Sequence, residues 1–153
     1  MRRRRRNPIP LVIVIILIMT VLVVSVRLFT GFSNSDPEDV VSRFYHYEQE
    51  GDFGSAWELF HPVMQERFSK NAYVTERSHI YMGHYGVSTF EYEIVEEEEI
   101  QNWKMAEDQE AFSTAYRLSA EQQFKSKFGT FIILQEVYAV QHEGEWKIVW
   151  DYN

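Results

Sequence analysis

The sequence predicts an α+β domain that follows one transmembrane helix. Three observations lead to this fold class. An uncharged apolar run covers residues 9–26, helical periodicity extends from Pro37 to about Met82, and alternation with a period of two begins after Gly86. Because the helical segments precede the strands, we expect about three helices to pack on one face of a curved antiparallel sheet.

The apolar run is long enough to cross a bilayer. Its sequence, IPLVIVIILIMTVLVVSV, would rise about 27 Å as a helix, which matches the hydrocarbon core. Arg2 to Arg6 stand directly before it, and basic residues are retained on the cytoplasmic side. We therefore divide the start of the chain into a cytoplasmic basic segment, a signal anchor in the lipid bilayer and a tether outside the membrane: 1–8, 9–28 and 29–36.

A cleaved secretory signal is the main alternative to an anchor. Signal peptides carry apolar regions of about 7–15 residues, followed by small residues at the cleavage site. Here the run is longer, and the segment that follows it, VRLFTGFSNSD, offers no such site. The pattern favours an uncleaved anchor in the cell membrane, with a cytoplasmic N-terminus and an extracytoplasmic C-terminal domain.

The outer part of the chain is strongly acidic. After Arg27 it holds nine basic and 23 acidic residues, a formal charge of −14. Such a domain repels nucleic acid, so the membrane span explains the arginine block better than a nucleic-acid site does. The chain has no cysteine, so it forms neither disulfides nor thiolate metal sites. This composition favours a bacterial envelope protein over a eukaryotic secreted one.

Helices are predicted first within residues 37–153, which are enough for one domain. Asp36 is expected to cap the first helix, and Pro37 to occupy its first position. Gly51 ends this helix, and Asp52 starts a second one. A third, less regular helical region begins at Pro62. Spacing of three and four marks the buried side of the first helix, which carries Val40, Val41, Phe44, Tyr45 and Glu48.

Strands are predicted after the glycine-punctuated segment MGHYG. Phe131 to Val140 is apolar on both faces, which is typical of a central strand. Glu143 and Gly144 are expected to turn the chain into the last strand. The run Glu96 to Glu99 interrupts the first alternation, which favours a solvated bulge or hairpin end over a calcium loop. Alternating apolar residues predict three further strands, at 90–94, 112–120 and 146–152.

Two segments carry a family resemblance. EQEGDFGSAWELF, Glu48 to Phe60, places a glycine–aspartate turn between two helices, and GEWKIVWDYN, Gly144 to Asn153, forms a closing strand. In this order of elements, they resemble the nuclear transport factor 2-like superfamily, in which three helices close a cone-shaped curved sheet. The chain is most similar to the amino-terminal domain that precedes the transpeptidase in some class B penicillin-binding proteins, which also has a counterpart of HYGVSTFEYEI, His84 to Ile94.

The resemblance implies a binding role without catalysis. In penicillin-binding proteins this domain is followed by a serine transpeptidase with S-x-x-K, S-D-N and K-T-G motifs. None of these motifs occurs in the sequence, so we do not expect transpeptidase chemistry. We expect a membrane-anchored binding or assembly module of the cell envelope, with a protein partner linked to penicillin-binding proteins and wall synthesis.

The alternative is a small-molecule-binding or ketosteroid-isomerase-like enzyme of the same fold. Such relatives use a Tyr or His with one or two carboxylates in the mouth of the cone. Tyr45 and His61 are candidate pocket residues, but core packing with a hydroxyl satisfied at the rim explains Tyr45 better, and a helix junction explains His61. A deep cavity around a buried carboxylate would favour the enzyme, and a filled interior would favour the module.

Surface recognition and metal binding are the remaining possibilities. Trp103 lies in the polar stretch QNWKMAEDQE and is the candidate for an exposed recognition residue. His79 and His84 are five residues apart, a spacing that does not place both on one face of an α-helix. We assign no catalytic residue, no cofactor and no metal ligand.

Overall fold

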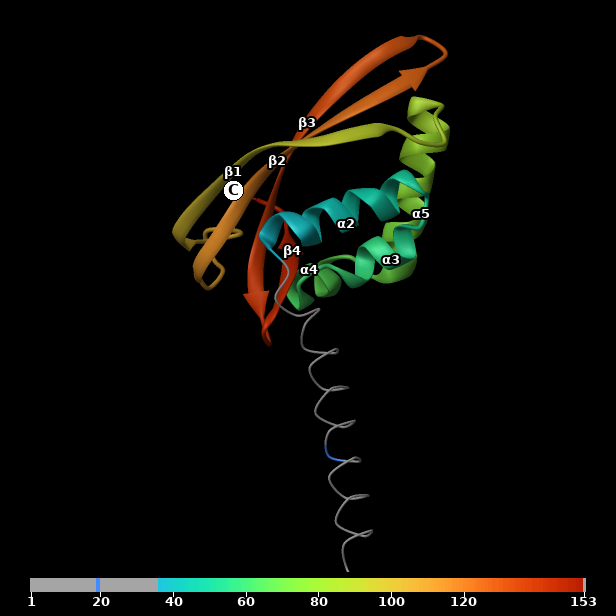
Figure 1. The fold of residues 1–153 in the computed structure, drawn as a ribbon. Helices are drawn as coiled ribbons and strands as arrows, with labels where there is room; N and C mark the ends of the chain where they lie inside the picture. The colour runs from blue at the N-terminus through green and yellow to red at the C-terminus, as the bar shows by residue number, and fades with distance from the viewer. Residues whose placement is uncertain (1–18, 20–35, 153) are drawn as a thin grey trace, which may run out of the picture. The chain divides into compact units, whose positions relative to one another are not determined.

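The computed structural model describes Met19 and residues 36–152 of the 153-residue chain. Within the compact unit Ser35–Asn153, four α-helices and a π-helix precede a four-stranded antiparallel sheet (Figure 1), which confirms the α+β class. The predicted basic segment, anchor and tether lie outside the described residues, apart from Met19 and Asp36. In the part of the chain that is described, no helix is long and apolar enough to span a membrane.

Helix α2, Pro37–Gln49, buries the predicted stripe, including the carboxylate of Glu48. Pro37 occupies the first position, where a missing N–H costs nothing because the helix has no partner for it there. Asp36 is the N-cap residue, but its side chain makes no capping hydrogen bond. The predicted helix start is therefore right in position and wrong in the group that caps it.

Two short helices follow, α3 at Phe53–Glu58 and α4 at Pro62–Arg67, as the start signals predict. The Asp52 carboxylate accepts a hydrogen bond from the Ser55 backbone N–H at 3.0 Å. His61 Nδ1 accepts one from the Val63 N–H at 3.2 Å. Each helix start is thus satisfied by the side chain that precedes it.

The third helical region continues as two further elements. Helix α5, Lys70–Ser78, runs into the π-helix η1, His79–Tyr85, which ends at Gly86 with a φ of 68°. The structure therefore has more helical elements than the three predicted. The difference arises at Ser69, whose hydroxyl accepts a hydrogen bond from the Ala72 N–H at 3.3 Å and starts a new helix after α4.

Strands β1 to β4 pair in sequence order, and each adjacent pair is antiparallel. The run Glu96 to Glu99 belongs to β1 and pairs in regular register with β2. A register shift lies just before it, between Ile94 and Glu96, so the strand has a bulge at Val95 rather than within the glutamate run. The β3–β4 turn is confirmed too, since Glu143 and Gly144 have φ values of 52° and 84°. The strands span Glu91–Trp103, Phe112–Ser126, Gly129–His142 and Glu145–Val149.

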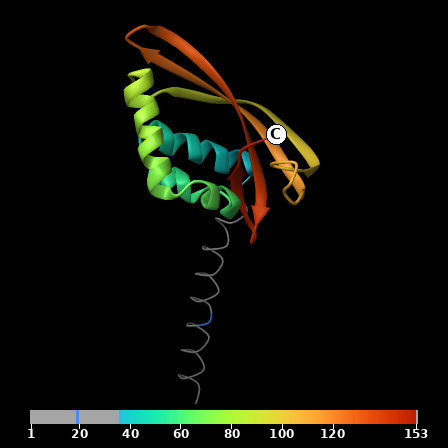
Figure 2. The same ribbon diagram turned by 180° about the vertical axis from the view of Figure 1, so that it is seen from behind.

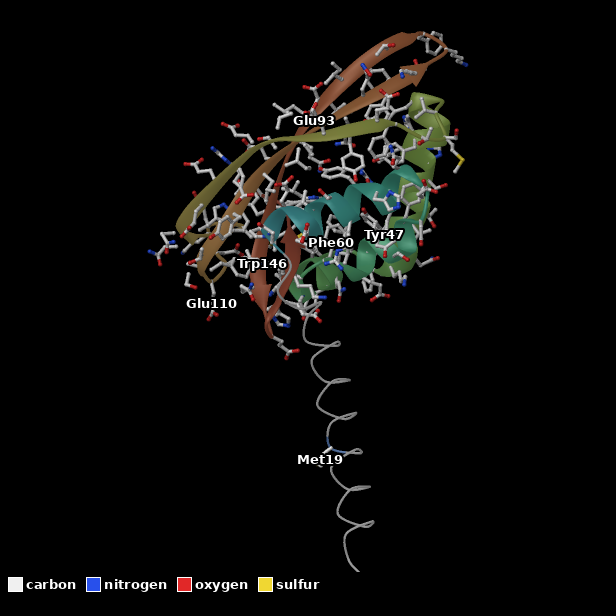
Figure 3. The ribbon with its side chains drawn as sticks, viewed as in Figure 1. Met19, Tyr47, Phe60, Glu93, Glu110 and Trp146 are labelled. Atoms are coloured by element: carbon white, nitrogen blue, oxygen red, sulfur yellow. The ribbon has the colours of Figure 1, made fainter. Side chains whose placement is uncertain are left out.

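The helices lie on one face of the bent sheet, as opposite views show in Figures 1 and 2. Helix α2 contacts all four strands. Phe60 lies in the layer of side chains between the helices and the sheet (Figure 3), with its ring 5.3 Å from Phe44 and 5.0 Å from Trp150. This aromatic layer is the core of the domain.

Met64→Ala is expected to lower the free energy of unfolding by about 2–5 kcal/mol, because the Met64 side chain is fully buried and its loss leaves a cavity. Met82→Ala is the matched control, since the Met82 side chain is 60% exposed and should change the value by less than about 0.5 kcal/mol. Urea unfolding followed by tryptophan fluorescence measures both. Equal losses would contradict the assigned core.

Candidate functional site

Among residues 36–152, the one buried carboxylate is that of Glu48, where α2 faces α5 and η1. Its Oε1 accepts a hydrogen bond from Arg77 Nε at 2.8 Å, and its Oε2 is bound by Arg77 Nη2. The Tyr81 hydroxyl donates to Oε2 at 2.7 Å, and the Tyr73 hydroxyl donates to Oε1. We refer to these four residues as the Glu48 cluster.

The Glu48 cluster keeps its partners in their hydrogen-donating forms. Burial raises the pKa of Tyr73 and of Tyr81, and the neighbouring Glu48 raises both further. Burial alone would lower the pKa of Arg77, but the contact with Glu48 outweighs it and holds that pKa well above its usual range. Both phenols therefore stay protonated and Arg77 stays charged around neutral pH.

The geometry of the Glu48 cluster suits a structural role. A general base needs room for a substrate within hydrogen-bonding reach of its carboxylate. Both oxygens of Glu48 are already engaged, and its side chain is fully buried. The Arg77 guanidinium also packs on the Tyr81 ring, with Cζ 4.8 Å from the ring centroid. The cluster thus ties α2 to α5 and η1.

Tyr45, a predicted pocket candidate, is fully buried on α2. Its ring lies 5.3 Å from Phe44 and 5.7 Å from Tyr92, so the preference for core packing is confirmed. The expectation that its hydroxyl is satisfied at the rim is wrong, because that oxygen is buried and has no hydrogen-bond partner among the described residues. Burial, followed by the nearby Glu48, raises the pKa of Tyr45.

His61, the second candidate, lies at the junction between α3 and α4, as predicted. Its ring centroid is 4.6 Å from His142 and 5.2 Å from Phe112, and its side chain helps to line a pocket of about 360 Å³. Partial burial lowers the pKa of His61 to about 4, with further contributions from His142 and Lys147. The ring is therefore neutral at physiological pH.

Trp103, the third candidate, is buried rather than exposed, so the prediction of a surface recognition residue is wrong. Its ring stacks on Tyr138 with a centroid distance of 4.0 Å and lies 5.9 Å from Phe112. The surrounding polar sequence misleads because Met105, two residues later, is buried as well. The Met105 carbonyl accepts a hydrogen bond from the Tyr152 N–H at 2.8 Å, which fastens this loop to the C-terminal segment.

The π-helix changes the relation between two histidines. His79 and His84 lie with ring centroids 4.7 Å apart, although α-helical spacing predicted separate faces. A π-helix brings residues five apart into register, which explains the difference. Across residues 36–152, no group of three or more His, Cys, Asp or Glu side chains is arranged to hold a metal ion.

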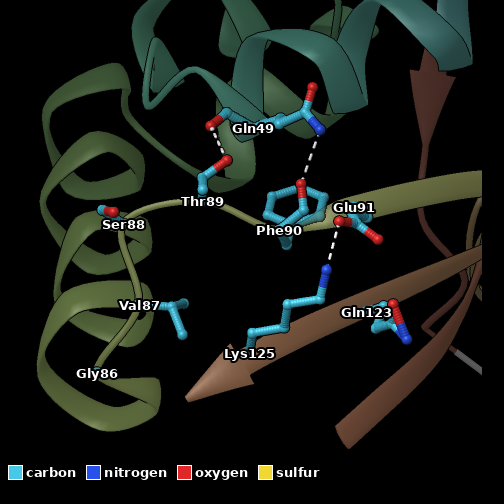
Figure 4. A pocket seen from close by; sticks show the side chains of 9 residues that line it. All are labelled: Gln49, Gly86, Val87, Ser88, Thr89, Phe90, Glu91, Gln123 and Lys125. Carbon is cyan, nitrogen blue, oxygen red and sulfur yellow. Dashed lines mark hydrogen bonds and ion pairs between the residues drawn. The ribbon is translucent and has the colours of Figure 1, made fainter. Parts of the chain in front are cut away.

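A pocket of about 440 Å³, lined by both polar and apolar groups, opens where the end of α2 meets the start of β1 and the end of β2 (Figure 4). Lys125 Nζ lies 2.5 Å from Glu91 Oε1, and Gln49 Nε2 donates to the Phe90 carbonyl at 2.7 Å. The Thr89 hydroxyl donates to the Gln49 carbonyl at 3.1 Å. Because its charges are paired, this pocket suits a polar or peptide ligand better than an ion.

One sheet edge beside this pocket is unpaired. Strand β4 pairs only with Tyr138–His142 of β3, so Gly129–Val137 has β2 on one side and no described strand on the other. We call Gly129–Val137 the free β3 edge. The prediction of a central strand is therefore wrong over this half. The signal was present in the β3–β4 turn, since even a strand that reached Tyr152 would end opposite Gln135.

The free β3 edge carries apolar side chains in solvent. Ile132 is 55% exposed, Leu134 is 62% exposed, and Phe128 in the adjoining turn is 86% exposed. No charged residue and no proline occur between Gly129 and Gln135. By contrast, the outer strand β1 exposes six glutamates, which discourage pairing at that edge: Glu91, Glu93 and Glu96 to Glu99.

No protein-family model matches this sequence, and no curated protein matches it significantly. The candidate site therefore rests on geometry alone. Of the features described, the free β3 edge is the one that leaves both apolar side chains and backbone groups available to a partner.

Arg77→Met is expected to lower the free energy of unfolding by about 3–5 kcal/mol, because it leaves the buried Glu48 carboxylate without its cation. Adding Glu48→Gln to the same chain should restore much of this loss. Lys70→Met is the matched control, since Lys70 pairs with Glu58 at the surface and should matter by less than about 1 kcal/mol. Urea unfolding measures these three variants and Glu48→Gln alone, and losses of the two single variants that simply add in the double variant would contradict a coupled pair.

Acidification from about pH 6.5 to about pH 4 is expected to destabilise the fold through His61. The unfolded chain takes up a proton at His61 below about 6.5, whereas the folded ring resists it to about 4, so this stability is present above 6.5 and lost on the way down. His61→Asn keeps an acceptor for the Val63 N–H and removes the titration. Urea unfolding across this range should show a shallower pH dependence for the variant, and identical profiles would refute the assignment.

Proposed function

We propose that this chain is a membrane-anchored, extracytoplasmic binding or assembly module of the bacterial cell envelope. Residues 9–28 would hold it in the cell membrane, and residues 37–153 would form a nuclear transport factor 2-like domain on the extracytoplasmic side of that membrane. Its partner would be a protein of the same envelope, in a role linked to wall synthesis. The arginine block before the apolar run and the acidic outer domain support this placement.

The filled interior supports a module over an isomerase-like enzyme. The only carboxylate among the fully buried side chains of residues 36–152 belongs to Glu48, and Arg77, Tyr73 and Tyr81 occupy both of its oxygens. Tyr45, the other polar candidate on α2, packs against aromatic rings. Substrate access to Glu48 would require the Glu48 cluster to separate, at the cost of exposing a buried ion pair.

The free β3 edge is the observation that carries the proposal. An exposed sheet edge can accept an extended strand from a partner, with backbone hydrogen bonds for affinity and side-chain contacts for specificity. Ile132 and Leu134 supply apolar contacts on one side of the sheet, and the pocket lined by Gln123 and Lys125 lies on the neighbouring strand. The net charge of the domain disfavours nucleic acid and anionic lipid as ligands of this surface.

A photo-crosslinking amino acid at position 134 of the full chain tests the proposal in intact bacterial cells. We expect position 134 to yield a defined crosslinked product that contains a membrane or envelope protein. Val95 is the matched control position, because it is an exposed aliphatic residue on the glutamate-rich edge strand β1. Equal yields at both positions, or products that contain cytoplasmic proteins alone, would overturn the proposed function.

A further inference from the structure

The chemistry of the free β3 edge points to one particular partner. We propose that it pairs with the same edge of a second copy of this chain, in antiparallel orientation, so that two four-stranded sheets join into one. This proposal rests on the proposed function, because it names the partner of the same surface.

Backbone groups are the first requirement for such pairing. Along an outer strand, alternate residues direct their N–H and C=O groups away from the sheet, where only another strand can pair with them regularly. From Gly129 to Val137 these groups face no described strand, and no proline removes a donor. The segment is therefore a continuous template for strand addition.

Side chains select the register. If the twofold axis passes Ile133, then Ile132 of each copy lies opposite Leu134 of the other, on the same face of the joined sheet. This register brings all four exposed aliphatic side chains together. A shift of one residue would place Ile132 and Leu134 on the face opposite their counterparts and lose this contact. The same register places Thr130 opposite Glu136 of the second copy.

Charge selects the antiparallel orientation. The hairpin beside the free β3 edge carries Lys127 and Lys125, the latter paired with Glu91, whereas Glu136, 3.7 Å from Arg117, lies near the other end of the edge. Antiparallel pairing brings the basic end of each copy toward the acidic end of the other, twice in one interface. Lys125 of β2 pairs with Thr130 of β3, and Thr130 would lie opposite Glu136 of the second copy. The backbones of Lys125 and that Glu136 would then lie two strand spacings, or about 10 Å, apart, a distance that the lysine and glutamate side chains can bridge. Parallel pairing would place the two Glu136 residues side by side.

The β1 edge of the sheet is unsuited to self-pairing. Strand β1 exposes Glu91, Glu93 and Glu96 to Glu99, and two such edges would bring like charges together. Overall repulsion between two copies with a charge of −14 also favours contact at a segment with few charges, and residues 129–135 carry none. The free β3 edge is where two acidic domains can approach with the least repulsion.

Engineered disulfides test both the partner and the register, because the natural chain has no cysteine. Two full-length copies with different tags are produced together in membranes, one with Thr130→Cys and the other with Glu136→Cys. Mild oxidation should join the two tags efficiently. Thr130→Cys alone should give little dimer, because the two copies of residue 130 would lie about 20 Å apart along the strands. Glu143→Cys, at the exposed β3–β4 turn, serves as the control position.

A second variant tests whether the apolar contact at the centre of the interface is required. Leu134→Lys, added to both cysteine copies, should reduce the mixed disulfide at least about tenfold, because it places charges in the apolar centre while the exposed position leaves folding intact. Absence of the mixed disulfide, or equal dimer from Thr130→Cys alone, would overturn the proposal. If the photo-crosslinker at position 134 then captures a different envelope protein, the binding role stands and self-pairing fails. If it captures nothing, both fail.

Discussion

The bidentate contact between Glu48 and Arg77 is the constraint on which the helical layer depends. A carboxylate that is fully buried requires a cation and hydrogen-bond donors around it, and α5 and η1 supply them from one side. This requirement positions the end of α2. From there, Gln49 binds the Phe90 carbonyl and the Thr89 hydroxyl, which places the start of β1 and shapes the pocket beside it. One buried ion pair thus orients both the helices and the sheet edge nearby.

The Glu48–Arg77 contact also leaves the interior of the domain without room for a ligand. In folds of this general shape a cavity between helices and sheet can hold a ligand, but here Arg77, Tyr73 and Tyr81 fill that space around the carboxylate. The open sites described lie on the periphery, at the pockets lined by Lys125 and by His61 and along the free β3 edge. The arrangement separates stability, which resides between the layers, from recognition, which resides at a border of the sheet.

Local signals made much of this fold predictable from sequence. Pro37, Asp52 and Pro62 mark helix starts, and the Glu143–Gly144 turn sets the last hairpin. Features that depend on distant residues were not predictable in this way. Arg77 lies 29 residues from Glu48 in the sequence, so no local pattern predicts their contact. Trp103 is buried by Tyr138 and Phe112 although its sequence neighbours are polar, and η1 brings His79 to His84 by a period that α-helical spacing excludes. Tertiary packing decides the first two cases, and the local change to a π-helix decides the third.

The contrast between the two borders of the sheet also limits how far an assembly can grow. A contact in which the same segment serves both copies is isologous, and it consumes the only unguarded border that each copy has within residues 36–152. The remaining borders of the joined sheet would then be β1, whose exposed glutamates resist further addition, and the short strand β4, whose outer edge is covered where Ile148 exchanges backbone hydrogen bonds with Leu59 and His61. Each copy therefore has one sheet border that can pair and other borders that resist pairing, which favours a closed dimer over an open fibre.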